Sequence, residues 1–252
     1  MIYKAYAKVN IFLKITAFRG NYHELVSRFM VVENLFDELE FRKKSRDAEF
    51  ELEGDFGCPL ESNTIFKAYI ALIEEGYTKA KDFLQSYSLH VSKKIPSFAG
   101  LGGGSSDAAT FLKMINKEAS LGIDTDKLSY IGSKVGADVP FFVYSFKSAN
   151  VSGIGEIVEE FKEESLDLEL LTPKILCDTS KVYKEFRRDI HFDIDMADIL
   201  KQMQSNEIVE KFTLVELNDL FKPAKRLYRD LEKYEKKGWF FSGSGSSFFR
   251  KK

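Results

Sequence analysis

The sequence predicts an α+β protein that folds into two lobes. Strand-like and helix-like segments are mixed along the 252 residues, without the regular strand–helix–strand repeat of a parallel α/β fold. Hydrophobic residues make up 44% of the chain, and at this length they suffice to bury a sizeable core. The pattern changes near residue 147. We therefore expect an N-terminal domain of residues 1–147 and a C-terminal domain of residues 148–252.

The charge balance and the cysteine count exclude several classes of protein. Lys and Arg number 37 against 39 Asp and Glu, whereas nucleic-acid-binding proteins usually carry a clear basic excess. The two cysteines, Cys58 and Cys177, form no CxxC motif, so neither a disulfide framework nor a zinc site is expected. Residues 1–4 lack the apolar core of a signal peptide, and no apolar stretch approaches the ~20 residues that span a bilayer. We expect a cytoplasmic protein with neither nucleic acid nor membrane as a partner.

The first expected strand covers residues 2–16 and carries the clearest pattern. Its odd-numbered positions from Ala5 to Ile15 are apolar, as they are when one face of a strand is buried. Lys8 and Asn10 lie together on the opposite face. Two polar side chains are thus presented side by side on a strand whose other face belongs to the core.

Five further elements are expected before or directly after a glycine-rich loop. A second strand, or a strand pair, is predicted within residues 29–41, and a short one over residues 47–52. Asn63 suits the N-cap position of a helix, because its side chain accepts hydrogen bonds from backbone N–H groups. A strand over residues 87–94 leads into the loop, and a helix begins near Ser105 beyond it.

The middle of the chain reads as one helix followed by strands. A helix over residues 125–135 ends at Gly136, a natural C-terminal cap. Residues 138–143, Asp-Val-Pro-Phe-Phe-Val, are expected to lead into a further strand. Residues 151–156 predict a hairpin, and residues 168–177 another strand.

The C-terminal part combines two helices with a pair of short strands. Helical patterns cover residues 196–203 and 223–237, with Pro223 at the first helical position of the second. Strand-like residues 239–241 and 247–249 flank a second loop of glycines and serines.

The glycine-rich loop predicts a phosphate-binding site. Residues 100–104 contain four glycines directly before a predicted helix, whose N-terminus offers N–H groups and the positive end of its dipole. The alternative is a tight turn capped by serine, but each glycine raises the ordering cost on folding, and four exceed what a turn requires. The expected phosphate-binding residues are Pro96, Ser97, Phe98, Ala99, Gly100, Leu101, Gly102, Gly103, Gly104, Ser105 and Ser106.

Better-known nucleotide motifs do not fit this loop. A Walker A loop ends in Gly-Lys-Ser/Thr, whereas Gly104 is followed by two serines. The dinucleotide fingerprint requires a third glycine where Ser105 stands. Residues 55–57 read Asp-Phe-Gly, the metal motif of protein kinases, but no His-Arg-Asp loop accompanies them, so a turn is expected.

The loop resembles the second motif of the GHMP kinases, the superfamily of galactose, homoserine, mevalonate and phosphomevalonate kinases. Residues 5–13, Ala-Tyr-Ala-Lys-Val-Asn-Ile-Phe-Leu, resemble one branch of it, which phosphorylates 4-diphosphocytidyl-2-C-methyl-D-erythritol. Further matches, in the superfamily's order, are residues 20–25, 136–142, 153–156 and 242–245. The resemblance implies ATP-dependent phosphorylation of the 2-hydroxyl of that compound in the non-mevalonate pathway of isoprenoid biosynthesis.

The resemblance also implies a particular two-lobed architecture. The N-terminal lobe is expected to be ribosomal-protein-S5-like and to bind ATP, and the smaller C-terminal lobe to be ferredoxin-like. The C-terminal lobe is expected to be abbreviated, because the chain ends at Lys252 directly after the third motif.

The resemblance assigns catalytic roles to two residues that lie far apart in the sequence. Asp138 matches the aspartate that takes the hydroxyl proton, and Lys8 matches the lysine that keeps this carboxylate ionised and polarises the nucleophile. Read singly, Lys8 is an exposed strand residue and Asp138 a loop cap. Their place in an ordered set of motifs favours the catalytic interpretation.

Binding residues follow from the resemblance in the same way. On the substrate side, Asn10, Tyr22, His23, Thr179 and Tyr183 match positions around the methylerythritol and cytosine groups. The two tyrosine rings suit a base that is bound by stacking, although the sequence around Tyr183 departs from the family pattern. On the ATP side, the matched positions are Asn63, Thr64 and Lys93, and the loop of residues 242–246 matches the third motif, with an ordinary hairpin turn as its alternative.

Mg²⁺ is expected together with ATP, but its ligands are not defined by the sequence. Ser105, Ser106 and Asp107 are candidates, and the alternative is an ion held mostly by ATP oxygens and water. The expected partners are therefore small molecules, ATP and a cytidine diphosphate-linked sugar alcohol, bound by a monomer or a weak homodimer.

Three other functions agree less well with the sequence. Another GHMP kinase, such as homoserine or mevalonate kinase, is disfavoured by the Tyr22-His23 segment and the Lys8/Asn10 pair. A catalytically inactive binding protein of the same fold is disfavoured because Lys8 and Asp138 are both present. An RNA-binding module is disfavoured because no basic, aromatic surface is apparent.

Overall fold

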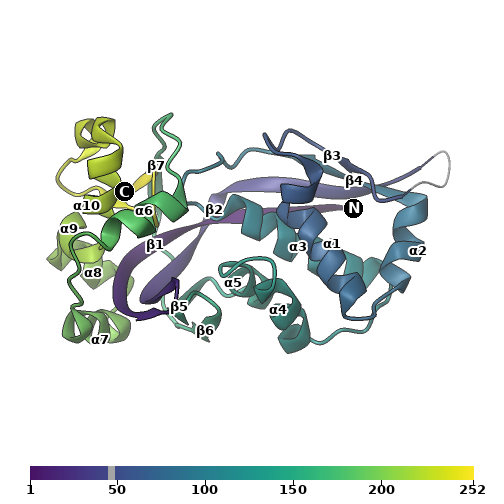
Figure 1. The fold of residues 1–252 in the computed structure, drawn as a ribbon, viewed down its shortest axis with the longest axis horizontal. Coiled ribbons are helices and arrows are strands. Elements are labelled where there is room, and N and C mark those ends of the chain that lie inside the picture. Colours follow the sequence, from purple (N-terminus) through teal and green to yellow (C-terminus); the bar gives the residue numbers. More distant parts are fainter. Residues whose placement is uncertain (45–48) are drawn as a thin grey trace. The chain divides into compact units, whose positions relative to one another are not determined.

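The computed structural model describes residues 1–44 and 49–252 (Figure 1). It divides into two compact units, each assembled from three segments of the chain. Unit 1 comprises Met1–Ala7, Glu33–Ile95 and Gly103–Ser145, and unit 2 comprises Lys8–Val32, Pro96–Gly102 and Phe146–Lys252. The domain boundary expected between residues 147 and 148 stays a prediction.

Two long strands contribute residues to both units. β1 (Ile2–Arg19) confirms the first predicted strand, and its apolar positions from Ala5 to Ile15 are at most 3% exposed. A turn with Gly20 at a φ of 59° leads into β2 (Tyr22–Lys43), which pairs with β1. The second strand is thus a single one, longer than the predicted residues 29–41.

In unit 1, residues 38–43 of β2 pair antiparallel with β4 (Tyr87–Ser92). β4 in turn pairs parallel with β3 (Leu52–Glu53). Residues 45–48 lie outside the described part of the chain. Of the described residues 49–52 of the strand expected over 47–52, only Leu52 belongs to β3.

Helices complete unit 1. They are α1 (Thr64–Glu74), α2 (Lys79–Ser86), α3 (Gly103–Glu118), α4 (Thr125–Ser133), α5 (Val139–Tyr144) and a 3₁₀ turn over Leu60–Ser62. Asn63 caps α1 as predicted, since its Oδ1 accepts from the N–H of Ile65 at 2.8 Å. Helix α3 begins two residues before the predicted start at Ser105.

Residues 138–143, which were expected only to lead into a further strand, form the N-cap and most of helix α5, and the strand begins at Ser148. Pro140 sits in the first turn, where a missing N–H group breaks no helical hydrogen bond. Val139, Phe141 and Val143 are at most 3% exposed, so the short helix is buried on nearly all sides. A continuous apolar run of this length has no period that distinguishes a buried helix from a buried strand.

Unit 2 contains two sets of strands. Residues 25–30 of β2 pair antiparallel with β5 (Ser148–Gly153), which pairs with β6 (Ile157–Glu160) and so confirms the predicted hairpin. A separate antiparallel sheet has the order β7-β9-β8, formed by Leu168–Leu171, Phe248–Lys251 and Phe240–Phe241. β7 ends six residues before the predicted end at Cys177.

The helices of unit 2 are only partly those expected from the sequence, because the segments 179–186, 205–211 and 214–217 were not predicted to be helical. They are α6 (Thr179–Phe186), α7 (Ile194–Gln202), α8 (Ser205–Lys211), α9 (Leu214–Leu217), α10 (Phe221–Leu227) and a 3₁₀ helix over Arg229–Tyr234. The helix expected over 223–237 therefore begins at Phe221, ahead of Pro223, and changes type after Tyr228. No helix in residues 1–44 and 49–252 is long and apolar enough to cross a bilayer.

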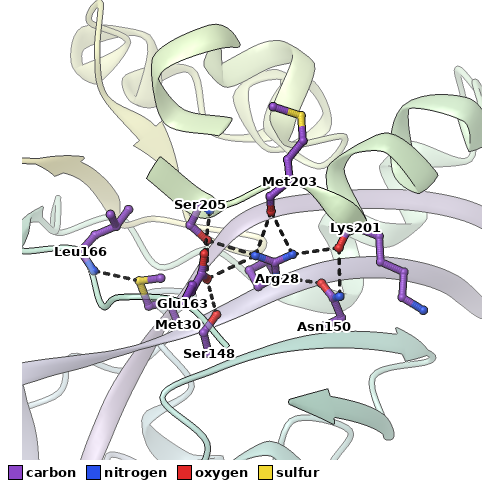
Figure 2. A network of polar contacts seen from close by, with 9 residues as sticks. All are labelled: Arg28, Met30, Ser148, Asn150, Glu163, Leu166, Lys201, Met203 and Ser205. Atoms are coloured by element: carbon purple, nitrogen blue, oxygen red, sulfur yellow. Dashed lines mark hydrogen bonds and ion pairs between the residues drawn. The ribbon is translucent and has the colours of Figure 1, made fainter. Parts of the chain in front are cut away.

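A buried arginine holds several of these elements together (Figure 2). Arg28 of β2 is 0% exposed, and its guanidinium lies over the ring of Phe161 at 3.3 Å from the centroid. It donates to Oδ1 of Asn150 at 2.7 Å, to the carbonyl of Lys201 at 3.0 Å and to that of Met203 at 3.3 Å. Arg28 thereby satisfies carbonyl groups at the C-terminal end of α7, which have no helical partner.

Glu163 neutralises this buried charge. Its Oε1 lies 3.2 Å from Nη1 of Arg28 and accepts hydroxyl hydrogen bonds from Ser148 at 2.5 Å and Ser205 at 2.7 Å. Its Oε2 accepts from the N–H of Ser205, the first residue of α8, at 2.7 Å. Figure 2 shows these groups converging from β2, β5, the segment after β6 and the α7–α8 connection.

Candidate active site

The first half of the predicted phosphate loop lies in unit 2 against the second glycine-serine loop. At Gly100, which has a φ of 72°, a Cβ atom would stand 2.2 Å from the carbonyl oxygen of Ser242. The Ser242 hydroxyl donates to the Gly100 carbonyl at 2.9 Å, and the N–H of Ser247 donates to the carbonyl of Ala99 at 3.0 Å. Only glycine allows this close approach of two backbones. The loop of residues 242–246 is therefore packed on residues 96–102.

Lys8 and Asn10 lie beside the same two loops in unit 2. The Lys8 Nζ donates to Oδ1 of Asn10 at 2.6 Å, and the Lys8 N–H donates to the carbonyl of Leu101 at 3.0 Å. The Asn10 N–H donates to the Ser242 hydroxyl at 3.2 Å. Lys8 is only 3% exposed and its Nζ lies 4.4 Å from the ring centroid of Phe29. The predicted pairing of Lys8 and Asn10 on one face of β1 is observed, but that face is buried rather than open.

The second half of the loop forms the first turn of α3 in unit 1. Gly103 opens the helix, and a Cβ there would lie 2.9 Å from Cγ2 of Ile95. The Thr64 hydroxyl donates to the carbonyl of Gly104 at 2.7 Å, which ties the start of α1 to the start of α3. Thr64 thus contacts the N-terminus of α3, and Asn63 directly precedes Thr64; their expected place on the ATP side stays a prediction.

Lys93 is clamped between two carboxylates in unit 1. Its Nζ lies 2.5 Å from Oδ2 of Asp107 and also contacts Oδ2 of Asp37. Burial lowers the pKa of Lys93, but the two carboxylates outweigh this effect and leave the pKa raised. Asp37 further accepts from the N–H of Ile95 at 2.8 Å, so it also fixes the strand end that precedes the loop.

Asp107 is the member of this cluster whose hydrogen bonding is incomplete. It lies on the first turns of α3, is 2% exposed, and its Oδ1 has no hydrogen-bond partner in the described residues. Burial, reinforced by the charge of Asp37, raises its pKa to about 7, although Lys93 acts in the opposite direction. The Asp107 carboxylate therefore has a pKa close to neutral pH.

Asp138 occupies the N-cap position of α5 in unit 1. The other end of this helix is held by Lys113 of α3, whose Nζ donates to the carbonyl of Phe142 at 2.8 Å and to the hydroxyl of Ser145 at 2.9 Å. Burial lowers the pKa of Lys113 to about 8. Lys113 therefore fixes the helix on which Asp138 is carried.

An aromatic cluster in unit 2 surrounds His23. The His23 ring centroid lies 5.1 Å from that of Phe18, 5.0 Å from that of Tyr183 and 6.0 Å from that of Phe186. Tyr183 and Phe186 come from α6, and His23 from the start of β2. Two residues that the sequence analysis assigned to one base-binding pocket, His23 and Tyr183, thus lie in contact.

The remaining predicted substrate residues lie near this cluster or near the loops. Tyr22 precedes His23 and is 63% exposed, so its ring is available for stacking. The Thr179 hydroxyl is 2.8 Å from that of Ser244, which connects the N-terminus of α6 to the second glycine-serine loop. Lys8, Asn10, Thr179 and residues 96–102 are brought together in unit 2, whereas Asn63, Thr64, Lys93 and Asp138 belong to unit 1.

Three residues of the site were missed by sequence reasoning. Asp37 binds Lys93, Ser27 accepts from the Asn10 amide at 3.0 Å, and Arg187 donates to Nε2 of His23 at 3.3 Å. Their partners are between 17 and 164 residues away in the sequence, so no local spacing marks them. Only Asp37 could have been identified from the sequence, because it is an acidic residue within an apolar strand pattern.

The described residues offer oxygen ligands to Mg²⁺ but no complete cage for it. They contain no cluster of three His, Cys, Asp or Glu side chains that suits a metal ion. The chemistry of Ser105, Ser106 and the partnerless Oδ1 of Asp107 fits a hard, oxygen-seeking cation. Such a partial set suits an ion that arrives with ATP and keeps most of its ligands from phosphate and water.

Known proteins share the fold of this chain. A family model described as the GHMP kinases N terminal domain matches residues 63–146. The crystal structure of the mevalonate kinase from Methanococcus jannaschii has a TM-score of 0.62 at 14% identity, over 100% of this chain and 90% of that one. These similarities define the class, a GHMP kinase fold, and confirm the predicted two-lobed α+β architecture.

Similarity in sequence over the whole length narrows this class. The chain is 54% identical over 257 residues to the 4-diphosphocytidyl-2-C-methyl-D-erythritol kinase of Sulfurimonas denitrificans, which covers 100% of this chain and 97% of that protein. A crystal structure of 4-(cytidine 5'-diphospho)-2C-methyl-D-erythritol kinase has a TM-score of 0.74 at 30% identity, over 99% of this chain and 89% of that one. The chain belongs to the family of 4-diphosphocytidyl-2-C-methyl-D-erythritol kinases.

Proposed function

We propose that this protein transfers the γ-phosphoryl group of ATP to the 2-hydroxyl of 4-diphosphocytidyl-2-C-methyl-D-erythritol. The products are the 2-phosphate of that compound and ADP, in the methylerythritol phosphate pathway to isoprenoid precursors. The observation that carries the proposal is the 54% identity over the full length to a kinase named for this substrate. Homoserine and mevalonate are not favoured as acceptors, because the likeness to mevalonate kinase, at 14% identity, extends to the fold alone.

The phosphates of ATP are bound by the loop of residues 96–106. Its second half offers the N–H groups of the first turn of α3, and the helix dipole adds positive potential at the same point. Lys93 contributes a cation that is held in place by Asp37 and Asp107. Because the chain carries a net charge of −2, these local groups supply the attraction for a highly anionic nucleotide.

Asp138 and Lys8 carry out the proton transfer. The acceptor hydroxyl is tertiary and weakly acidic, so the reaction depends on positioning and on help with its proton. As the hydroxyl oxygen bonds to the γ-phosphorus, the bond from that phosphorus to the bridging oxygen of ADP breaks, and the hydroxyl proton passes to the carboxylate of Asp138. Lys8 stabilises the developing alkoxide, and Asn10 orients Lys8 through the 2.6 Å hydrogen bond.

The cytosine end of the substrate is bound by Tyr22, His23 and Tyr183. The exposed ring of Tyr22 and the ring of Tyr183 present aromatic faces to the base, while His23 reads its polar edge. Thr179 lies between this cluster and the second glycine-serine loop.

Mg²⁺ would enter as part of MgATP, with Ser105, Ser106 and Asp107 as its neighbours in the protein. A monomeric or weakly dimeric state and a cytoplasmic location stay predictions.

The acceptor is tested by an ADP-release assay with three compounds in parallel: 4-diphosphocytidyl-2-C-methyl-D-erythritol, homoserine and mevalonate. We expect substrate-dependent ADP release with the first alone, and a new phosphate monoester signal in the ³¹P spectrum of its product. Equal turnover of homoserine or mevalonate would contradict the proposed acceptor.

A further inference from the structure

An arginine that belongs to none of the family motifs contacts the histidine of the base-binding cluster. Arg187 directly follows α6, and its Nε donates to Nε2 of His23 at 3.3 Å. Its Nη2 donates to the carbonyl of Gly20 at 3.3 Å, and its guanidinium lies 4.7 Å from the ring centroid of Phe18. Two hydrogen bonds and one stacking contact thus fix an exposed guanidinium in a single orientation beside His23.

This contact decides where the imidazole proton resides. A guanidinium has only donors, so Nε2 of His23 must accept and therefore carries no proton. Burial, with the charge of Arg187 acting in the same direction, lowers the pKa of His23, which keeps the ring neutral near pH 7. A neutral imidazole whose Nε2 accepts carries its proton on Nδ1. Nδ1 is then a hydrogen-bond donor, and it has no hydrogen-bond partner among the described residues.

We propose that Arg187 is a specificity-determining residue, which selects cytosine over uracil by holding His23 as the Nδ1–H tautomer. The inference rests on the proposed function, in which His23 reads the edge of a pyrimidine base. Ring nitrogen N3 of cytosine is an acceptor and matches a donor at Nδ1, whereas N3 of uracil bears a hydrogen and opposes it. A buried site built for one hydrogen-bond pattern discriminates strongly against a base that leaves its donor unpaired.

Arg187→Met tests the tautomer directly, in the protein without substrate. The chain has three histidines, so the ¹⁵N resonances of the His23 ring are readily assigned in long-range ¹H–¹⁵N spectra. We expect the Nδ1–H pattern for His23 in the unaltered protein and a shift toward the Nε2–H form in the variant. Arg188→Met is the matched control, since Arg188 pairs with Glu185 at 3.2 Å and contacts no group of this cluster among the described residues. An Nε2–H pattern in the unaltered protein would overturn the inference.

Base selectivity is measured by calorimetry with CDP and UDP, while a non-hydrolysable ATP analogue saturates the ATP site. We expect Arg187→Met to reduce the ratio of CDP to UDP affinity about 10-fold or more, and Arg188→Met to leave it unchanged. An equal loss for both nucleotides would mean that Arg187 serves the diphosphate rather than the base, and would overturn the inference. An unchanged ratio of CDP to UDP affinity in Arg187→Met would also overturn the inference. Neither readout requires phosphoryl transfer, so failure of the proposed function appears separately, as absence of turnover in the ADP-release assay.

Discussion

Replacing Arg28 by Met should destabilise unit 2 strongly while leaving the proposed site residues in place. The side chain is 0% exposed, and Glu163, its ionic partner at 3.2 Å, is 1% exposed. Met fills a similar volume but removes every donor of the guanidinium. The carboxylate of Glu163 then stays buried without its counter-ion, and the carbonyls of Lys201 and Met203 lose a donor.

The expected cost follows from the isolation of this pair from water. Breaking a buried ion pair by removing one partner typically costs about 3–5 kcal/mol, whereas an exposed pair contributes about 0–1 kcal/mol. Glu163 retains hydrogen bonds from the hydroxyls of Ser148 and Ser205, which places the expected loss near the lower limit, about 3 kcal/mol. Adding Glu163→Gln to Arg28→Met removes the isolated charge, so the double variant should lose less than the sum of the two single losses.

Urea unfolding followed by tryptophan fluorescence is the appropriate assay. Trp239 is the only tryptophan of the chain and belongs to unit 2, so its emission reports on the unit that contains Arg28. Lys211→Met is the control, because Lys211 pairs with Glu207 at 3.1 Å with both side chains more than half exposed. The control should change the free energy of unfolding by less than ~0.5 kcal/mol. A loss below about 1 kcal/mol for Arg28→Met would refute the reasoning that this pair organises unit 2.

Two further predictions concern the base and the helix that carries Asp138. Tyr22→Ala or Tyr183→Ala should remove stacking worth ~1–3 kcal/mol and chiefly raise the KM for the cytidyl substrate; an unchanged KM in both variants would place the cytosine elsewhere. Burial lowers the pKa of Lys113 from 10.5 to about 8, so between these values the unfolded chain binds more protons and stability should rise with pH. Urea unfolding at pH 8 and pH 10 should show this rise diminished in Lys113→Met, and identical slopes for the two proteins would contradict the burial argument.

The sequence was sufficient to predict the elements that depend on residues close together in the chain. The alternation of β1 and the cap at Asn63 depend on neighbours within a few residues, and both are observed. The glycine-rich loop was recognisable because glycine is needed where two backbones meet, as the 2.2 Å separation at Gly100 shows. By contrast, α5 has a buried apolar sequence without a period, so this helix was not predicted and its residues were expected only to lead into a strand.

The polar contacts that organise the molecule were not predictable in this way. Arg28 lies in a strand where a charged residue ordinarily faces solvent, and its partners are 122 to 177 residues distant. Arg187 follows a helix that the sequence analysis did not predict, and its contact with His23 spans 164 residues. Contacts between residues so far apart in the sequence depend on which helices and strands pack together. The composition of a single segment does not indicate which other segments it packs against.

The central claim is that Asp138 and Lys8 act as one unit in transferring the hydroxyl proton during phosphorylation of the cytidyl substrate. The measurement is kcat for Asp138→Asn, Lys8→Met and the double variant, with ATP and substrate saturating and folding verified by circular dichroism. Loss of a general base typically costs ~10²–10⁴-fold, and loss of a stabilising cation about 3 kcal/mol. We predict that the double variant is little slower than the slower single variant, because both residues serve one step. Near-normal kcat for Asp138→Asn, or strictly multiplicative losses in the double variant, would contradict the claim.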